Sequence, residues 1–283
     1  MTEKTPLDSY LQTWPLHIVW GTTGVGKTGL LSSLVDMPEL RPILMIDADS
    51  GGETSRSLEG AGRLERRTPS DPDMDVVALT QWLVAEIHRA RTGDYGAIGI
   101  EGIGRIYSLF QGESALGLLE DPKANLKGLT AALDGNKGRA SYKAGAALVK
   151  GVVTSIAMLR RAKAGQAKAG KRGGLVVVTL TTRFAQVTRG GQMIETQAPE
   201  LSKNATASLM AESDGCYEFR RKGAKTQILV DADEDCEFRK ARGPGTAATL
   251  AGLANPTFQV ILNAFASGNA PTATTPNPEP ESI

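Results

Sequence analysis

The feature that most constrains this chain is a glycine-rich loop near its N-terminus, Gly21-Thr22-Thr23-Gly24-Val25-Gly26-Lys27-Thr28. The apolar run Leu16 to Trp20 precedes the loop, and a potentially helical apolar run from Gly29 to Val35 follows it. Glycines let a backbone fold around an anion, so that its N–H groups face the bound phosphates. Lys27 would reach the β- and γ-phosphates of a nucleoside triphosphate, and Thr28 would place its hydroxyl on Mg²⁺. In this strand–loop–helix context the pattern predicts a nucleotide site.

Composition and charge narrow the possible classes of protein. The 283 residues have a formal net charge of +1 and are 41% hydrophobic, which is enough for a sizeable core. A strongly basic, nucleic-acid-coating protein is excluded, although a localised basic face is not. Because there is no apolar run of membrane-spanning length and no apolar signal segment, we expect a cytoplasmic protein without a membrane partner. If a phage encodes the protein, the expected location is the cytoplasm of the host cell.

The order of segments predicts one large domain. We expect a polar N-terminal lead-in over residues 1–15 and an α/β domain over 16–267. Within that domain, residues 111–140 are rich in Gly, Asn, Lys and Asp and are predicted to form a mobile insert. Residues 268–283 are rich in Pro, Thr, Asn and Glu, which predicts a disordered tail.

Acidic residues end two predicted strands. The buried run Ile43 to Ile46 leads into Asp47-Ala48-Asp49, and the run Ala97 to Ile100 leads into Glu101. Carboxylates at the carboxyl ends of parallel strands point toward the ligand crevice of an open α/β sheet. Asp47 and Asp49 can also be read as helix N-caps. Glu101 could reach a metal ion through water or polarise an attacking water, and both roles remain open.

A third apolar run, Leu175 to Leu180, predicts another buried strand. It ends in Thr181 and Thr182, either of which could sense a γ-phosphate or serve as an ordinary strand-end threonine. Residues 184–204 alternate in polarity around a Gly-Gly pair and predict a protruding hairpin or mobile loop.

Two basic segments are candidates for phosphate contacts. The tract Arg160 to Arg172 reads either as a solvated helix end or as a contact to a phosphate backbone. From Gly215 onward the pattern predicts an antiparallel extension of the sheet, which ends in Lys240-Ala241-Arg242. Alternate residues of a strand share a face, so Lys240 and Arg242 could both reach a neighbouring subunit's phosphates.

The order of these parts resembles the RecA-like ATPase core over roughly residues 16 to 265. The likeness is strongest to the small RecA-like ATPases of phages linked to single-strand annealing and recombination. It implies an α/β fold with a RecA-like P-loop core, in which helices flank a mostly parallel sheet with an antiparallel C-terminal β extension.

The resemblance also assigns roles to the candidate residues. Asp49 would activate the attacking water, with Asp47 as the alternative, and Lys240 and Arg242 look like the finger pair of DnaB- and KaiC-type relatives. Loops near residues 104–115 and 183–200 would face single-stranded DNA. Under this resemblance the catalytic set is Lys27, Asp49, Glu101, Lys240 and Arg242. The nucleotide contacts are residues 21–29, Gly29 included, together with Thr181, and the Mg²⁺ contacts are Thr28, Glu101 and Asp47.

The resulting hypothesis is an ATP- and Mg²⁺-dependent ATPase that assembles as a ring or filament on single-stranded DNA. Phage or host recombination and replication proteins would be its partners. Two alternatives remain. One is a monomeric P-loop kinase of a small molecule or nucleotide, with residues 160–172 as its lid. The other is a nucleotide-gated, non-catalytic interaction protein, because Glu101 stands where related ATPases usually have Asp.

Overall fold

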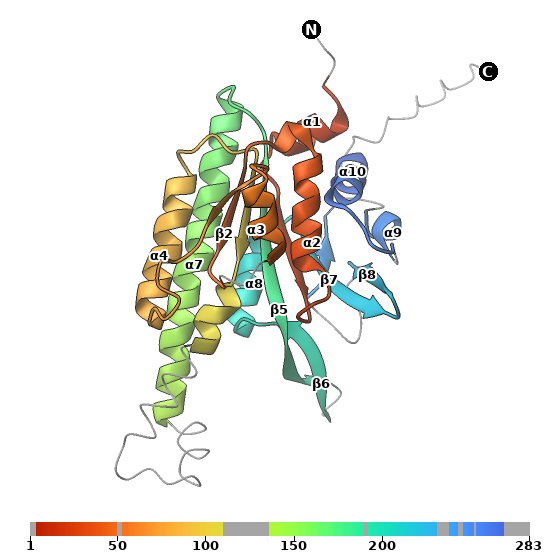
Figure 1. The fold of residues 1–283 in the computed structure, drawn as a ribbon. Helices are drawn as coiled ribbons and strands as arrows, with labels where there is room; N and C mark the ends of the chain where they lie inside the picture. Colours follow the sequence, from red (N-terminus) through yellow and green to blue (C-terminus); the bar gives the residue numbers. More distant parts are fainter. Residues whose placement is uncertain are drawn as a thin grey trace, which may run out of the picture.

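A computed structural model describes residues 4–49, 53–109, 136–189, 192–230, 238–242, 246–251 and 253–268 (Figure 1). Its helices, in chain order, are α1 Pro6–Leu11, α2 Lys27–Ser32, η1 Ser33–Asp36, η2 Pro38–Leu40, α3 Glu53–Gly60, α4 Val76–Ala90, α7 Asn136–Lys168, α8 Lys203–Glu212, α9 Thr246–Leu250 and α10 Phe258–Gly268. Its strands are β1 Leu16–Gly21, β2 Ile43–Asp47, β3 Glu65–Arg67, β4 Ala97–Glu101, β5 Leu175–Arg189, β6 Gln192–Pro199, β7 Gly215–Lys222, β8 Lys225–Leu229 and β9 Lys240–Ala241.

The strands form one mostly parallel sheet in the order β3-β2-β4-β5-β1-β7-β8. Every neighbouring pair from β3 to β7 is parallel, whereas β8 and β9 pair antiparallel with β7, and β6 pairs antiparallel with β5. Strand β5 separates β1, which leads into the glycine-rich loop, from β4, which ends in Glu101. The predicted fold class, a mostly parallel sheet flanked by helices with an antiparallel extension on its C-terminal side, is confirmed.

Two apolar cores cover the two faces of the sheet. Alternate residues of β1 divide between them, with Ile18 and Trp20 packing on one side and Val19 on the other. Helices α4, α7 and α8 close the first core, and α1, α2, α9 and α10 close the second (Figure 1). Burial on both faces explains why the strands read as continuous apolar runs.

The N-terminal segment differs from the predicted polar lead-in. Residues 6–11 form helix α1, which Thr5 and Asp8 cap reciprocally, and Tyr10, Leu11 and Trp14 are buried. A helix this short shows too few turns for its periodicity to stand out in sequence, so its capping box is the signal that could have revealed it.

The two other predicted flexible segments fall mostly outside the described residues. Of the expected insert, only residues 136–140 are described, and they form the first turns of α7 rather than a loop. The expected tail is described only at Gly268, the last residue of α10. None of the helices described is long and apolar enough to cross a membrane.

Candidate nucleotide-binding site

The glycine-rich loop joins the end of β1 to the start of α2, and its backbone requires glycine at several positions. Gly24 and Gly26 have φ angles of 75° and 102°, which L side chains rarely adopt. A Cβ on Gly21 would lie 2.3 Å from the backbone oxygen of Phe219 in the neighbouring strand β7. Val25 is buried in the core beneath α2 and so anchors the middle of the loop. The loop is therefore a fixed cradle rather than a flexible turn.

Lys27 bends back over this cradle. Its Nζ donates to the backbone oxygens of Gly21 at 2.8 Å and Thr22 at 2.9 Å. Partial burial lowers the pKa of the Lys27 ammonium, while the carboxylates of Glu101 and Asp49 act in the opposite direction. Because the phosphates of a nucleotide are stronger acceptors than carbonyls, the ammonium would exchange these contacts for charged ones on binding.

Glu101 lies against the first residues of α2. Its Oε1 accepts hydrogen bonds from the hydroxyls of Thr28 at 3.2 Å and Thr179 at 3.1 Å. Burial raises the pKa of the Glu101 carboxyl, and the nearby charge of Asp47 adds to the increase. The structure thus brings together Thr28 and Glu101, which are 73 positions apart in the sequence.

Asp47 and Asp49 follow the same strand but have different surroundings. Asp47 is 1% exposed and forms a buried ion pair with Arg66, whose Nη2 lies 2.6 Å from its Oδ2. Its other oxygen accepts the backbone N–H of Asp49 at 3.0 Å. The Asp49 side chain reaches solvent in the cleft. Partial burial of the carboxyl nevertheless raises the pKa of Asp49, and the charge of Asp47 raises it further. Asp47 is therefore engaged within the protein, and Asp49 faces the cleft.

These residues line one cleft of about 730 Å³ at the carboxyl ends of β1, β2, β4 and β5. The predicted residues among its lining are Thr23, Gly24, Gly26, Lys27, Thr28, Gly29, Asp47, Asp49, Glu101 and Thr181. Gly21, Thr22 and Val25 shape the loop without lining the cleft. Thr182, the alternative to Thr181, has a buried hydroxyl without a described partner and does not line the cleft.

Sequence reasoning missed several residues of the cleft. Arg105 and Ser108 come from the helical residues 103–109, and Glu200 follows β6. Arg105 donates to the backbone oxygens of Ala48 at 2.7 Å and Pro72 at 2.6 Å, while Ser108 donates to Glu200. Helical spacing after Glu101 could have suggested Arg105 and Ser108, whereas no local pattern marks Glu200. The other missed residues are Gly102, Gly104, Thr179 and Leu180.

The chemistry of the cleft fits Mg²⁺ held jointly by protein and nucleotide. Among the described residues, no group of three or more His, Cys, Asp or Glu side chains is placed to hold a metal ion by itself. Mg²⁺ keeps several waters and is usually bound by one or two carboxylates together with substrate phosphates. The adjacent oxygens of Thr28 and Glu101 provide a hard-donor pair of this kind.

The predicted finger residues lie at the opposite end of the sheet, where β9 pairs with the first residues of β7. Lys240 Nζ donates to the backbone oxygens of Met210 at 2.6 Å and Ser213 at 2.9 Å. Arg242 Nη2 donates to the Ala211 oxygen at 2.8 Å. Both cations thus cap carbonyls at the end of α8 in their own chain, and their contact with a neighbouring subunit stays a prediction.

Part of the basic tract at the end of α7 is also engaged within the chain. Arg160 donates to the backbone oxygens of Trp14 and Glu212 and pairs with Asp214 at 2.8 Å. Lys163 is buried and donates to the Gly93 oxygen. Arg160 and Lys163 are therefore bound within the chain, whereas Arg161, Lys168 and Lys171 are exposed, as in the first of the two sequence interpretations, a solvated helix end.

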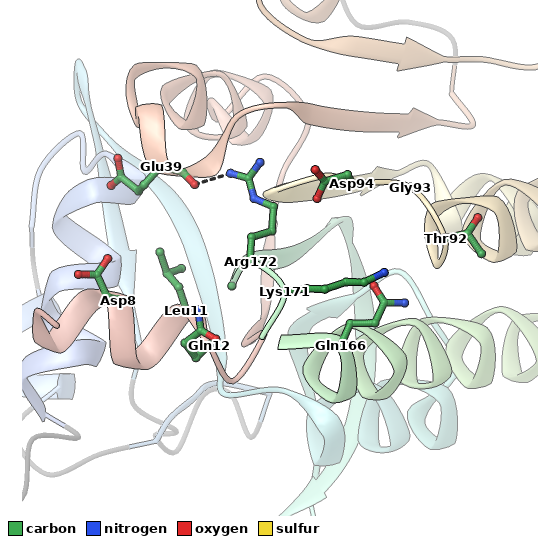
Figure 2. Close-up of a pocket in the computed structure, with 11 residues that line it drawn as sticks. Asp8, Leu11, Gln12, Glu39, Thr92, Gly93, Asp94, Gln166, Lys171 and Arg172 are labelled. Carbon is green, nitrogen blue, oxygen red and sulfur yellow. Dashed lines mark hydrogen bonds between the residues drawn. The ribbon is translucent and has the colours of Figure 1, made fainter. Parts of the chain in front are cut away.

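A second cavity, of about 700 Å³, lies beside this tract at the amino ends of the strands (Figure 2). Arg172 extends into it and donates to the Glu39 backbone oxygen at 2.7 Å. Side chains of both charge signs line this cavity, namely Asp8, Glu39, Asp94, Lys171 and Arg172. Lys171 and Arg172 belong to the basic tract, and none of the residues predicted to bind the nucleotide lines this cavity.

The segments expected to face single-stranded DNA are described in part, and residues 104–109 of the first are helical rather than the predicted loop. Residues 183–189 and 192–199 belong to the long β5–β6 hairpin, which confirms the predicted hairpin (Figure 1). Tyr107, one of few aromatic residues near these segments, is half-buried against the core.

Comparisons with known proteins give distant similarities of fold. No protein-family model and no curated protein matches the chain. The structure is similar to an ATPase from the type III secretion system of pathogenic bacteria, at 12% identity and a TM-score of 0.39. That match covers 73% of this chain and 52% of the ATPase chain, about half of its length.

Two further solved structures are matched over most of their length. The RadB recombinase has 14% identity and a TM-score of 0.41, with 80% of this chain and 83% of that chain covered. The flagellar accessory protein FlaH from Methanocaldococcus jannaschii has 12% identity and a TM-score of 0.35, with 81% and 85% covered. These values assign no activity to this chain.

Proposed function

We propose that the cleft binds ATP with Mg²⁺ and hydrolyses it. The observation that carries this proposal is that Lys27, Thr28, Glu101 and Asp49 lie together in one cleft. They surround a loop whose positions 21, 24 and 26 require glycine. A phosphate cradle, a cation, a hard-donor pair and an exposed carboxylate are the groups that phosphoryl transfer to water requires.

The roles of Lys27, Thr28 and Glu101 follow from their positions. The loop N–H groups and Lys27 would bind the β- and γ-phosphates, and Thr28 and Glu101 would hold the Mg²⁺ ion that accompanies the nucleotide. When bound, Mg²⁺ neutralises charge that develops on the phosphates. The 3.2 Å contact between Thr28 and Glu101 favours this role for Glu101 over polarisation of the attacking water.

Asp49 is the better candidate for activating water. A general base must reach its proton within the site, and a raised pKa makes a carboxylate a stronger base at neutral pH. Asp49 meets both conditions, because its side chain faces the cleft and its pKa is raised. Asp47 is already bound by Arg66, so we assign it to positioning the strand end.

The wider proposal is an oligomer that acts on single-stranded DNA in phage-type recombination, annealing or replication. In an oligomer, Arg242 would be the finger of the pair, because its side chain is exposed and its ion pair with Asp214 is long, with 3.6 Å between Nη1 and Oδ1. A neighbour's phosphates would have to draw it away from the α8 carbonyls. Lys240 is more enclosed and would mainly hold β9 in place.

The kinase alternative loses the feature that supported it. Its lid would be the tract 160–172, which is anchored at the amino ends of the strands, whereas the glycine-rich loop follows the carboxyl end of β1.

The experiment is ATP hydrolysis with and without single-stranded DNA over a range of protein concentrations, with Lys27→Ala as the inactive control. A rate that rises with DNA, and more than linearly with protein, would support shared sites in a DNA-bound assembly. A rate linear in protein and indifferent to DNA would leave an ATPase without the oligomer or DNA role. Equal rates for wild type and Lys27→Ala would refute the ATPase itself.

A further inference from the structure

The β7–β8 hairpin carries a cluster of cations beside the glycine-rich loop. Gly21, the last residue of β1, is level with Phe219 of β7, so the following residues of β7 extend past the carboxyl end of β1. The residues of the hairpin tip, 220–225, are all exposed. It contains Arg220, Arg221, Lys222 and Lys225 and no acidic residue.

Most of this charge is not neutralised by the described parts of the chain. Arg220 pairs with Glu218, its Nε lying 2.9 Å from Oε1. Among the described residues, Arg221, Lys222 and Lys225 take part in no ion pair. Lys222 and Lys225 are also directly opposite one another across the hairpin. Like charges in that arrangement repel each other. An anionic partner would remove the repulsion.

A hydrogen bond joins the hairpin to the glycine-rich loop. Thr226, which is opposite Arg221 in the hairpin, donates through its Oγ1 to the Val25 backbone oxygen at 2.8 Å. Asn255 also binds this residue: its Oδ1 accepts the backbone N–H of Thr226 at 2.9 Å, and its backbone N–H donates to the Thr226 oxygen at 2.7 Å. A change in the loop would therefore be transmitted to the hairpin through Thr226.

From this arrangement we propose that Arg221, Lys222 and Lys225 bind the phosphate backbone of a nucleic acid, and that Thr226 links this contact to the nucleotide site. None of the three cations lines the nucleotide cleft, so they do not serve the phosphates bound there. Exposed cations spaced along a protruding turn match a chain of repeating phosphates. The proposal rests on the proposed function for its nucleotide dependence. It assigns the nucleic-acid contact to a hairpin that the sequence interpretation predicted only as part of the antiparallel extension.

The test compares two variants with the same loss of charge. R221Q/K222Q/K225Q removes the hairpin cations, and K150Q/K168Q/K171Q removes exposed cations on or just after α7. Binding of a fluorescently labelled oligo(dT) is measured by anisotropy over a range of salt concentrations, and binding of a fluorescent ATP analogue is measured in parallel.

We expect the hairpin variant to bind oligo(dT) roughly tenfold more weakly or worse. Its salt slope should be smaller by about two, since each lost contact to a single strand removes about 0.7. It should bind the ATP analogue like the wild type, and the α7 variant should retain both affinities. Unchanged oligo(dT) affinity in the hairpin variant, or loss in the α7 variant alone, would overturn the proposal.

Three further outcomes separate this proposal from the proposed function. Loss of the ATP analogue in the hairpin variant would reassign the cations to the nucleotide and overturn the proposal. Wild type that binds the ATP analogue but not oligo(dT) would also overturn it, while leaving the nucleotide site intact. Wild type that binds oligo(dT) through the hairpin but no ATP analogue would refute the proposed function and leave the hairpin contact standing.

The link through Thr226 is tested with Thr226→Val and the conservative Thr226→Ser. In wild type and Thr226→Ser, the affinity for oligo(dT) should differ with and without ATP. In Thr226→Val the two affinities should be equal, because valine cannot donate to the Val25 oxygen. A Thr226→Val variant that keeps the full ATP dependence would overturn the coupling.

Discussion

The two ends of the parallel sheet use their cations in different ways. At the carboxyl ends, Lys27 lines an open cleft, although it also donates to two carbonyls of the glycine-rich loop, and the hairpin cations Arg221, Lys222 and Lys225 extend into solvent. At the amino ends, Arg160, Lys163, Arg172, Lys240 and Arg242 all donate to backbone carbonyls of their own chain.

The difference shows why a basic motif alone does not identify a binding surface. The last carbonyls of a helix lack partners within the helix, and cations are favoured there. Helix α8 ends beside β9 and α7, so Lys240, Arg242 and Arg160 satisfy carbonyls of its final residues and of the turn that follows. Within the described part of the chain, the hairpin cations at the carboxyl end of the sheet donate to no such helix-end carbonyls, so they stay available for a ligand. We therefore expect changes at the carboxyl end to affect activity and changes at the amino end to affect stability. Arg242 is the exception under the proposed oligomer, in which it would also serve hydrolysis in a neighbouring subunit.

Asp47 is the largest expected exception, since it lies at the carboxyl end but is engaged in the protein. Asp47→Asn should lower the free energy of unfolding by about 3–5 kcal/mol, because it leaves the buried Arg66 without its charged partner. Urea denaturation measures this change. Stability within error of wild type would show that the Arg66 pair is not structural, and it would return Asp47 to the candidates for direct catalysis.

Asp49 should behave in the opposite way to its neighbour. Asp49→Asn should slow ATP hydrolysis by about 10²- to 10⁴-fold, the usual contribution of a general base, with little change in stability. Steady-state phosphate release and urea denaturation on the same sample provide the two readouts. If hydrolysis survives in Asp49→Asn, another group activates the water.

Arg242 tests the amino end directly. As a cap on α8, it should contribute about 1 kcal/mol or less to stability, because it is 46% exposed and solvent screens its charge. Arg242→Ala is measured for stability, ATP binding and ATP hydrolysis. A small loss of stability with unchanged hydrolysis per folded molecule would leave it a cap. Abolished hydrolysis with intact ATP binding would instead establish the finger and break the contrast between the two ends.

His17 concerns stability alone, and its effect depends on pH. Complete burial lowers its pKa to about 3, against about 6.5 for an exposed histidine. The unfolded chain therefore binds a proton at this residue that the folded chain does not, and stability is lost as the pH falls below about 6.5. Wild type should lose more unfolding free energy between pH 7 and pH 5 than His17→Leu does. Equal losses would show that His17 is not the responsible group.

The sequence was most informative where the signal is local. Continuous apolar runs predicted β1, β2, β4 and β5, and the glycine spacing predicted the loop whose φ angles the structure reports. Residues that join the cleft from distant elements left no comparable pattern. Arg105 and Glu200 belong to the cleft only because residues 103–109 and the end of β6 fold back over it.

The sequence also did not predict which cations bind backbone carbonyls of their own chain. Whether Lys240 faces a neighbour or the end of α8 depends on where α8 stops, and the strand pattern around Lys240 contains no information about that point.

The central claim is that Glu101 and the glycine-rich loop form one site for ATP hydrolysis, and Glu101→Gln tests it most directly. The substitution keeps the size of the side chain and an acceptor for Thr28, but it removes the charge that would face Mg²⁺. We predict that Glu101→Gln binds ATP within a few-fold of wild type and hydrolyses it at least about 10²-fold more slowly. Wild-type hydrolysis in Glu101→Gln would contradict the account.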